Sequence, residues 1–356
     1  MAWVPVTHGW KRALLALPIT AVIVLLLGSC SSSAISAPTY TPPATAAPLS
    51  FASVPGIVDP TNHGWPRQVR GLNGLVTVKS KPSRIITLSV GHDEMTYGLV
   101  PADRVVAVGS STRNPLYSNV ADLARNAPVV SLDPEAILAA KPDVMVTSPY
   151  IKPELVGLLS AAGLPVIEVA LAQGDVKDRI SDVLFLGYIY GEEERAMALA
   201  REIQQRYEAI EAAVANKPAA LRPTVLAMSR YAGSIYASGA GSTPGNIIEA
   251  AGGINAAAAM EPYPVITFES IIALRPAFII LTQSTEDGGE QFQKDILSTP
   301  ALADVPAVKN GRVYLVGNRY FTTLSYWNVA GIQQLANILW PADFGQKQFT
   351  PFSLPG

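Results

Sequence analysis

Two segments of the chain repeat one pattern of residues, and each copy carries a glutamate at the same position. The first reads DPEAILAAKPDVMV from Asp133 and the second reads TFESIIALRPAFII from Thr267, so Glu135 and Glu269 correspond. Each glutamate opens an expected short helix, where the helix dipole favours an exposed negative charge. Two matched carboxylates can form ion pairs with basic residues of a partner, which orient that partner more than they tighten binding. The alternative is that each glutamate only stabilises its own helix.

A second set of candidates consists of arginines and tyrosines in loops expected to follow strands. Arginine pairs with carboxylate or phenolate oxygens and stacks on aromatic rings, and tyrosine adds apolar area and one hydrogen bond. Ligands of parallel α/β sheets lie beyond the carboxyl ends of the strands, so these residues predict a cleft for a large, flat, anionic ligand. The alternative is that they are solvated loop tips. They are Arg113, Tyr117, Tyr150, Arg230, Tyr231, Tyr236, Arg319 and Tyr320.

The sequence offers little for catalysis or for metal binding. Of its three histidines, His8 lies in an expected leader and His63 in an expected tether. His92, followed by Asp93 and Glu94, suggests a metal site, but no second histidine lies at ligand spacing. We therefore expect the two acids to stabilise a helix start. The segments GSSTRN and GAGSTPGN lack the Gly-Lys-Ser/Thr ending of a P-loop. We expect neither an enzyme nor a cofactor.

Residues 1–30 predict export and lipid attachment. Lys11 and Arg12 precede the apolar run Ala13–Leu27, which has the length of a signal core and is shorter than the ~20 residues of a membrane span. The segment LLGSC resembles a bacterial lipoprotein signal, in which the cysteine becomes the lipidated N-terminus, and Cys30 is the only cysteine of the chain. A cleaved signal without lipid is the alternative. We expect an extracytoplasmic protein, in the periplasm or at the cell surface, anchored through Cys30.

Composition separates a tether from a folded part. Residues 31–70 are expected to be flexible, because the stretch up to Pro60 is rich in Ser, Thr, Ala and Pro and cannot bury enough apolar surface to fold. The rest, about 285 residues, is enough for two domains. We expect an N-terminal lobe at 71–191, a linking helix at 192–216 and a C-terminal lobe at 217–356. The net charge is −2 and no run of Lys or Arg occurs, so nucleic acid is not an expected partner.

In both expected lobes, short apolar runs rich in β-branched residues alternate with helical segments. This alternation predicts parallel sheets with right-handed crossovers. Between the lobes, residues 192–215 place apolar side chains at three- and four-residue spacing without Gly or Pro, which predicts a helix of about 36 Å. Such a helix can join the lobes as a stiff connector, and an ordinary surface helix is the alternative. Strands are expected at 84–89, 105–108, 144–147, 165–169, 224–229, 277–282 and 312–316.

Five segments, in this order, resemble the bacterial ABC-transporter substrate-binding proteins for ferric siderophores, haem and cobalamin. They are PSRIITLSVGHDEMTYGLVPADRVVAVG, PEAILAAKPDVMV, IYASGAGSTPGNIIEAAGGINAA, FESIIALRPAFIIL and VKNGRVYLV. The resemblance covers about residues 82–339 and implies two Rossmann-like α/β lobes with parallel sheets, joined by a single long helix. It also implies that Glu135 and Glu269 meet arginines of a membrane permease, which works with an ATPase. Tyr263 lies where some relatives carry a ligand-stacking aromatic residue.

The expected ligand is a ferric siderophore, because arginines combined with tyrosines suit an anionic chelate. Cobalamin, which relies more on aromatic than on cationic side chains, is one alternative. Haem is another, since a tyrosine can serve as its axial ligand. From a different functional class, a surface sensor or interaction protein with the same fold is also an alternative. We expect a monomer with no bound metal of its own.

Overall fold

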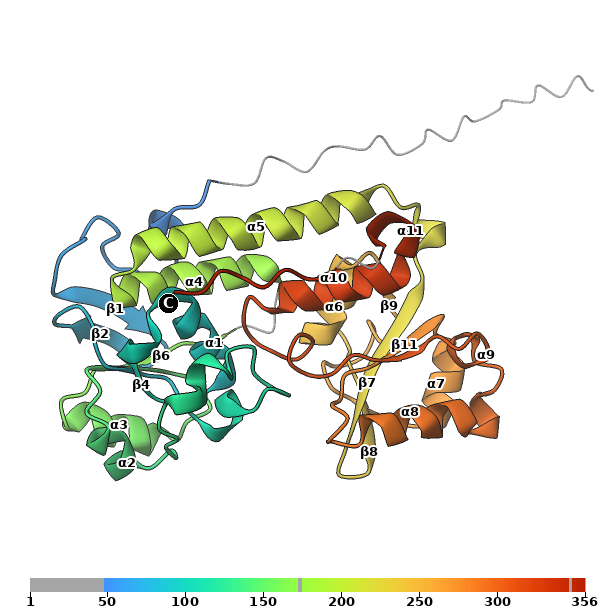
Figure 1. Cartoon of the computed structure of the whole chain (residues 1–356), viewed down its shortest axis with the longest axis horizontal. Coiled ribbons are helices and arrows are strands. Elements are labelled where there is room, and N and C mark those ends of the chain that lie inside the picture. The colour runs from blue at the N-terminus through green and yellow to red at the C-terminus, as the bar shows by residue number, and fades with distance from the viewer. Residues whose placement is uncertain (1–47, 172–174, 346–347, 356) are drawn as a thin grey trace, which may run out of the picture. The chain divides into compact units, whose positions relative to one another are not determined.

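A computed structural model describes residues 48–171, 175–345 and 348–355 of the protein (Figure 1). In this part, two α/β lobes are joined by the long helix α5 (Glu193–Ala215). The predicted leader with Cys30, and residues 31–47 of the predicted tether, lie outside the described residues. Within the described ranges, no helix combines the length and the apolar character needed to cross a membrane.

The N-terminal lobe is built on a four-stranded parallel sheet with the order β4-β3-β5-β6. Its strands are short and almost entirely buried, because helices cover both faces of a parallel sheet. A β-hairpin precedes this sheet and lies beside β6. The elements are β1 (Arg67–Gly71), β2 (Gly74–Val78), β3 (Ile85–Ile86), α1 (Val90–Leu99), β4 (Val105–Ala107), α2 (Pro134–Ala139), β5 (Val144–Thr147), α3 (Pro153–Ala161), β6 (Val166–Glu168) and α4 (Val176–Tyr190).

The C-terminal lobe contains a six-stranded sheet that is mixed rather than parallel. Its order is β10-β8-β7-β11-β12, and β9 pairs with β7. Helix α7 and strand β11 in this lobe form the second copy of the repeated pattern, whose first copy is formed by α2 and β5 in the N-terminal lobe. The elements are β7 (Thr224–Tyr231), β8 (Ser234–Ala237), α6 (Thr243–Ala250), β9 (Ile254–Asn255), β10 (Val265–Ile266), α7 (Phe268–Leu274), β11 (Phe278–Leu281), α8 (Gly289–Ser298), α9 (Pro306–Lys309), β12 (Val313–Leu315), α10 (Asn328–Leu339) and α11 (Pro341–Phe344).

The expectation of a purely parallel sheet is wrong for one side of the C-terminal lobe. β7 turns directly into β8 through Ala232 and Gly233, both of which have positive φ, 48° and 83°. A two-residue turn of this kind joins antiparallel strands, because its twist matches theirs. Residues 230–236, expected to form a loop, therefore form a β-hairpin. β7, β9, β11 and β12 are parallel, as predicted.

Helix α5 spans about 35 Å and contacts both lobes, so it is the predicted connector. It packs against α4 and α1 of the N-terminal lobe and against α10 of the C-terminal lobe. The predicted apolar stripe is confirmed at Ala196, Leu199, Ile203, Ile210 and Val214, all buried. One hydrophobic cluster runs through α4, α5 and the inner layers of both lobes. The connector is thus part of the core of the molecule.

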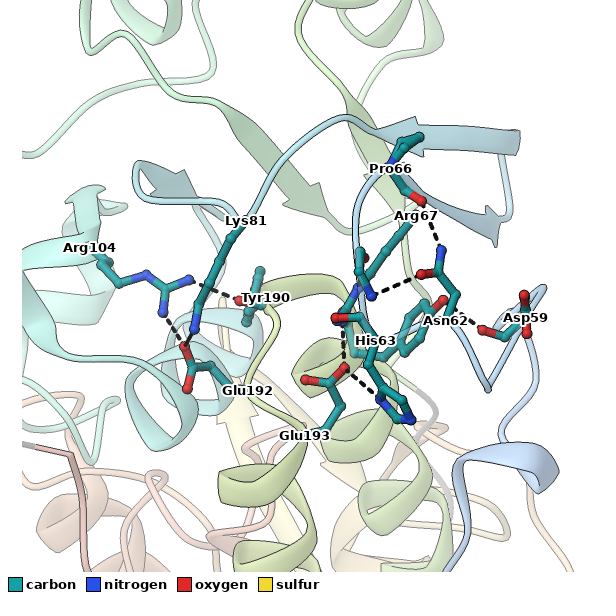
Figure 2. A network of polar contacts seen from close by, with 12 residues as sticks. Asp59, Asn62, His63, Pro66, Arg67, Lys81, Arg104, Tyr190, Glu192 and Glu193 are labelled. Atoms are coloured by element: carbon teal, nitrogen blue, oxygen red, sulfur yellow. Dashed lines mark hydrogen bonds and ion pairs between the residues drawn. The ribbon is translucent and has the colours of Figure 1, made fainter.

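The start of α5 is held by a network of ion pairs (Figure 2). The Glu192 carboxylate accepts Lys81 Nζ at 2.8 Å and Arg104 at 2.5 Å. Glu193 pairs at 2.7 Å with Arg67, which is only 2% exposed and stacks on Trp65. Carboxylates at a helix start also interact favourably with the helix dipole. The network joins the start of β1, the segment after β2 and the 3-10 helix Ala102–Arg104 to the connecting helix.

The folded part begins earlier than the predicted end of the tether at residue 70. The short 3-10 helix Phe51–Ser53 and most of β1 lie inside the predicted tether. Val54 and Val69 in this segment are buried against the N-terminal lobe. Small and polar residues dominate the composition of the segment, so its composition does not reveal the few apolar side chains that pack against the lobe.

Candidate ligand cleft and docking face

A pocket of about 410 Å³ lies between the two lobes. The N-terminal lobe contributes residues that follow β3, β4, β5 and β6, and the C-terminal lobe contributes the segment after β12. The carboxyl ends of parallel strands meet at one edge of a sheet, and ligands of α/β proteins bind there. The pocket is therefore the candidate ligand cleft, at the sheet edge that the sequence predicts.

The chemistry of this cleft is neutral. No Lys, Arg, Asp or Glu is among the described residues that line it. Hydroxyl groups, two phenols, one histidine and apolar side chains make up the surface instead. The side chains that define it are Ser89, His92, Ser111, Tyr117, Ser148, Tyr150, Leu171, Thr322, Thr323 and Leu324.

His92 is a fixed, uncharged wall of the cleft. Its Nε2 donates to the carbonyl of Val169 at 3.0 Å, and its Nδ1 lies 2.7 Å from the Ser89 hydroxyl, from which it accepts. Burial lowers the pKa of His92 to about 4, because the charged imidazolium would be poorly solvated there. Among the described residues, no cluster of three His, Cys, Asp or Glu side chains is arranged to hold a metal ion.

Asp93 lies in the first turn of α1, as expected, but both Asp93 and Glu94 are fully buried. Asp93 accepts hydrogen bonds from the hydroxyls of Thr87 and Thr112. Burial raises the pKa of Asp93 to about 7 and also raises the pKa of Glu94, although their hydrogen bonds oppose the shift. Neither position can be recognised as buried from its residue type, because carboxylates are almost never buried without a special set of donors.

Of the nine predicted ligand-binding residues, the structure brings Tyr117 and Tyr150 into the cleft. Tyr150 is 87% exposed, so its ring is available to a ligand. The Tyr117 hydroxyl instead donates to the carboxylate of Asp287, which belongs to the C-terminal lobe. Asp287 is a cleft-edge residue that cannot be recognised from the sequence, because its neighbours in the chain form no motif.

Arg230 lies in β7 and is engaged within the C-terminal lobe. Its guanidinium forms an ion pair with Asp295 at 2.6 Å and lies over the ring of Phe292 at 4.3 Å. Tyr320 is also engaged, since it stacks on Trp327 at 6.4 Å and packs on Phe349 at 6.3 Å. Ligand contact by these two residues stays a prediction. Their contacts within the protein do not favour it, because both side chains are already engaged.

The other five predicted residues lie outside the lining of the cleft. Arg113 is exposed at the end of the 3-10 helix Ser110–Arg113, whose Ser111 does line the cleft. Arg319 is exposed, with its guanidinium 4.7 Å from the ring centre of Tyr320. The three tyrosines lie on the β7–β8–β10 side of the lobe: Tyr231 (75% exposed), Tyr236 (half-buried, paired with Val265) and Tyr263 (46% exposed).

A second pocket, of about 440 Å³, lies between α5, α6 and α10. Tyr207, Glu211 and Arg222 line it together with Asn246 and Asn328. None of the residues that line it also lines the cleft between the lobes, and it is not built from the loops that follow the parallel strands. The interlobe cleft is therefore the better candidate for the main ligand.

Glu135 and Glu269 occupy equivalent positions in the structure. Each is the second residue of a short helix, α2 or α7, and each is exposed. The two helices belong to different lobes and lie on the side away from α5 (Figure 1). A hydrogen bond with Thr267 lowers the pKa of Glu269. Both carboxylates are available to a partner.

The predicted repeat of a helix–turn–strand unit is confirmed by the backbone. Asp133 caps α2 by accepting from the Ala136 amide at 2.9 Å, and Thr267 forms a capping box at the start of α7. Lys141 and Arg275, which correspond in the repeat, both have left-handed φ values, 49° and 44°. Each is followed by proline and then by a buried strand, β5 or β11. The two glutamates are thus presented by matching local structures.

Comparison with known proteins agrees with this architecture. The profile of the periplasmic binding protein family matches residues 85–320. An ABC transporter substrate-binding lipoprotein of Bacillus subtilis, YvrC, is 25% identical over 274 residues, which cover 76% of this chain and 83% of YvrC. A cobalamin-binding protein of Halobacterium salinarum is 26% identical over 250 residues, covering 69% of this chain and 64% of that protein.

Solved structures show the same fold. The periplasmic heme-binding protein RhuT from Roseiflexus sp. RS-1 aligns with a TM-score of 0.63 at 23% identity, covering 73% of this chain and 99% of that one. An ABC-type Fe3+-hydroxamate transport protein from Saccharomonospora viridis aligns with a TM-score of 0.63 at 21% identity, covering 78% and 99%. The two-lobed α/β fold with one long connecting helix is therefore that of these binding proteins.

Proposed function

Because the chain belongs to the periplasmic binding protein family, we propose that it is the extracytoplasmic binding component of an ABC importer, which holds a small molecule in the cleft between its lobes and delivers it to a membrane permease. The family consists of binding proteins, so the predicted absence of an enzymatic activity fits its members. The single observation that carries the proposal is a cleft at the carboxyl ends of the parallel strands, flanked by two lobes with matching exposed glutamates.

The chemistry of the cleft favours an uncharged metal complex, and we place cobalamin ahead of the ferric siderophore that the arginines suggest. The hydroxyls of Ser89, Ser111 and Ser148 and the exposed ring of Tyr150 suit a ligand with amide groups and a flat ring system. The cobalamin-binding relative supports the same class. At about 410 Å³ the cleft is near the small end of pockets for drug-sized ligands. A corrinoid therefore requires the lobes to separate at the edge of the cleft.

A ferric siderophore is the second candidate, and one observation favours it. Arg113 is exposed only two residues from Ser111 in the cleft wall. A large anionic chelate that extends beyond the cleft can pair with this guanidinium. Haem is a third candidate, for which Tyr150 is the available phenol.

Isothermal titration calorimetry of the purified full chain tests the ligand class. Cyanocobalamin, cobinamide, haemin and ferric hydroxamate and catecholate siderophores are titrated separately. We expect binding of the two corrinoids and a loss of affinity in Tyr150→Ala. Binding of an anionic siderophore that Arg113→Ala weakens, without corrinoid binding, establishes the second candidate. Failure of the folded protein to bind any of these ligands contradicts all three candidates, cobalamin, ferric siderophore and haem.

Anchoring through Cys30 and docking through Glu135 and Glu269 complete the proposal. The lipid on Cys30 keeps the binding protein close to its permease, and two exposed carboxylates on separate lobes fix its orientation on permease arginines. Incorporation of a labelled fatty acid that Cys30→Ala abolishes is the expected result for the anchor. Labelling that persists in this variant excludes Cys30 as the attachment site.

A further inference from the structure

One face of helix α1 lies directly against the C-terminal lobe. Gly91, Glu94 and Gly98 share this face, because residues three and seven apart lie on one side of a helix. A methyl group added at Gly98 would lie 2.5 Å from the Tyr326 hydroxyl, and one at Gly91 would lie 3.3 Å from Leu324. The two glycines therefore permit a close approach between α1 and residues 323–326.

Glu94, between the two glycines, binds donors from both lobes. On its own lobe, Oε1 accepts from the backbone amide of Asn119 at 2.7 Å and from its side-chain amide at 2.8 Å. On the other lobe, Oε2 accepts from the hydroxyls of Thr323, at 2.6 Å, and Ser325. The Asn119 side chain also donates to the carbonyl of Arg319 in the C-terminal lobe at 2.8 Å.

The Glu94 carboxylate is fully buried, and no ion pair to it occurs among the described residues. Its polar contacts are thus all hydrogen bonds, and half of them come from the opposite lobe. A buried carboxylate binds its donors strongly, because leaving it partly satisfied is costly away from bulk solvent. Separation of the lobes at this point would remove two of its four donors.

The neighbouring residue Asp93 provides an internal comparison. It is equally buried and lies on the same helix, but its two hydroxyl donors, Thr87 and Thr112, both belong to the N-terminal lobe. The adjacent carboxylates therefore differ in one respect that matters here. Asp93 organises one lobe, whereas Glu94 connects two.

We propose that Glu94 is a positioning residue that acts as the pivot between the lobes and sets the width of the ligand cleft. Thr323 carries this connection, since it binds Glu94 and also lines the cleft. His92, two residues before Glu94, lines the opposite wall. The pivot therefore lies at the base of the cleft, and its spacing determines how far apart the two walls stand. The proposal relies on the proposed function only in that the cleft holds the ligand.

Distance measurement between spin labels tests the pivot without any ligand. The labels are attached at Ser160→Cys on α3 and Lys294→Cys on α8, both exposed, in the full chain carrying Cys30→Ala. We expect Glu94→Gln to broaden the interlobe distance distribution, because an amide keeps only one acceptor oxygen and cannot accept from the donors of both lobes at once. The Ser325 hydroxyl accepts from the Trp327 amide at 3.3 Å and donates its own hydrogen to Glu94. We expect the matched variant Asp93→Asn to leave the distribution unchanged.

An unchanged distribution in Glu94→Gln, or equal broadening in both variants, overturns the pivot. If Glu94→Gln does not fold, the double variant Thr323→Val, Ser325→Ala removes the same connection from the other lobe and is expected to broaden the distribution. An unchanged distribution in that double variant also overturns the proposal. Because no ligand is present, these results are independent of the calorimetric test of function.

Discussion

Tyr117 and Asp287 join the two lobes at the edge of the cleft, where the phenol donates a 2.5 Å hydrogen bond to the carboxylate. The bond raises the pKa of Tyr117 and is exposed to solvent on the Asp287 side. Ser284 and Asn318 hold the same carboxylate oxygen from within the C-terminal lobe. We infer that a ligand as large as a corrinoid breaks this contact when it enters the cleft, whose volume is about 410 Å³.

We therefore predict that Tyr117→Phe speeds the association of cyanocobalamin. Loss of one hydrogen bond of about 1 kcal/mol shifts the closed state toward the open one by about fivefold. Stopped-flow mixing measures the association rate constant, and Asp287→Asn is expected to act in the same direction. Tyr150→Phe is the matched control, since it removes a hydroxyl from the same cleft without touching the contact between the lobes. An equal acceleration by Tyr150→Phe contradicts the assignment.

Arg230 gives a second prediction, which concerns the ligand rather than the motion. Its guanidinium is occupied by Asp295 and by the ring of Phe292. We expect Arg230→Gln to change the affinity for cyanocobalamin, measured by calorimetry, by less than about twofold. The control is Arg113→Gln, which removes an exposed guanidinium near the cleft wall. A large loss of affinity in Arg230→Gln alone restores the arginine-based prediction of an anionic ligand.

The sequence predicts the regular part of this fold well. Apolar runs locate β5 and β11 to within one residue, and the apolar spacing of α5 finds the connector, because both signals come from burial on a fixed period. Helix α4 is not predicted, since its segment VLFLGYIY is apolar on all sides and has no periodic polar face. The hairpin at Ala232 and Gly233 is not predicted either, because the turn needs positive φ at an alanine.

The site is harder to predict than the fold, for a reason that Arg230 and Glu94 illustrate. Each side chain takes its partner from a segment far away in the sequence, Asp295 in one case and Thr323 with Ser325 in the other. A residue type indicates which chemistry is available but not which partner has already taken it. The loops at the strand ends, including the one that carries Arg319 and reaches Thr323, were identifiable from the pattern. No motif, however, marked Thr322–Leu324 as the part of that loop that lines the cleft.

The buried carboxylate of Asp93 predicts a pH-dependent stability. Burial raises its pKa to about 7 from an ordinary value of 3.8. The folded state therefore binds a proton that the unfolded state releases between about pH 4 and 7, and the contribution of Asp93 to stability falls as the pH rises through this window. Asp93→Asn cannot ionise. We expect its free energy of unfolding, relative to the parent, to rise across the window by up to about 4 kcal/mol and to level off above pH 7.

Urea unfolding at a series of pH values measures this difference. His92, whose pKa burial lowers to about 4, changes stability in the opposite direction as the pH rises. It does so in both proteins, so its effect cancels when the variant is compared with the parent. A constant difference between the two proteins from pH 4 to 8 shows that Asp93 is ionised throughout in the folded state.

Glu135 and Glu269 give the last prediction, which separates ligand capture from delivery. Both carboxylates are exposed on matching helices of different lobes, and neither lies in the cleft. We expect the double variant Glu135→Ala, Glu269→Ala to bind ligand as the parent does. We also expect it to lose uptake of the same ligand in cells, because the binding protein loses both charges that orient it on the permease. Each single variant is expected to retain part of the uptake. Glu154→Ala, on the exposed start of α3, is the matched control, since it removes a helix-start glutamate that is not duplicated. Uptake that survives in the double variant removes the docking role and leaves the two glutamates as stabilisers of their own helices.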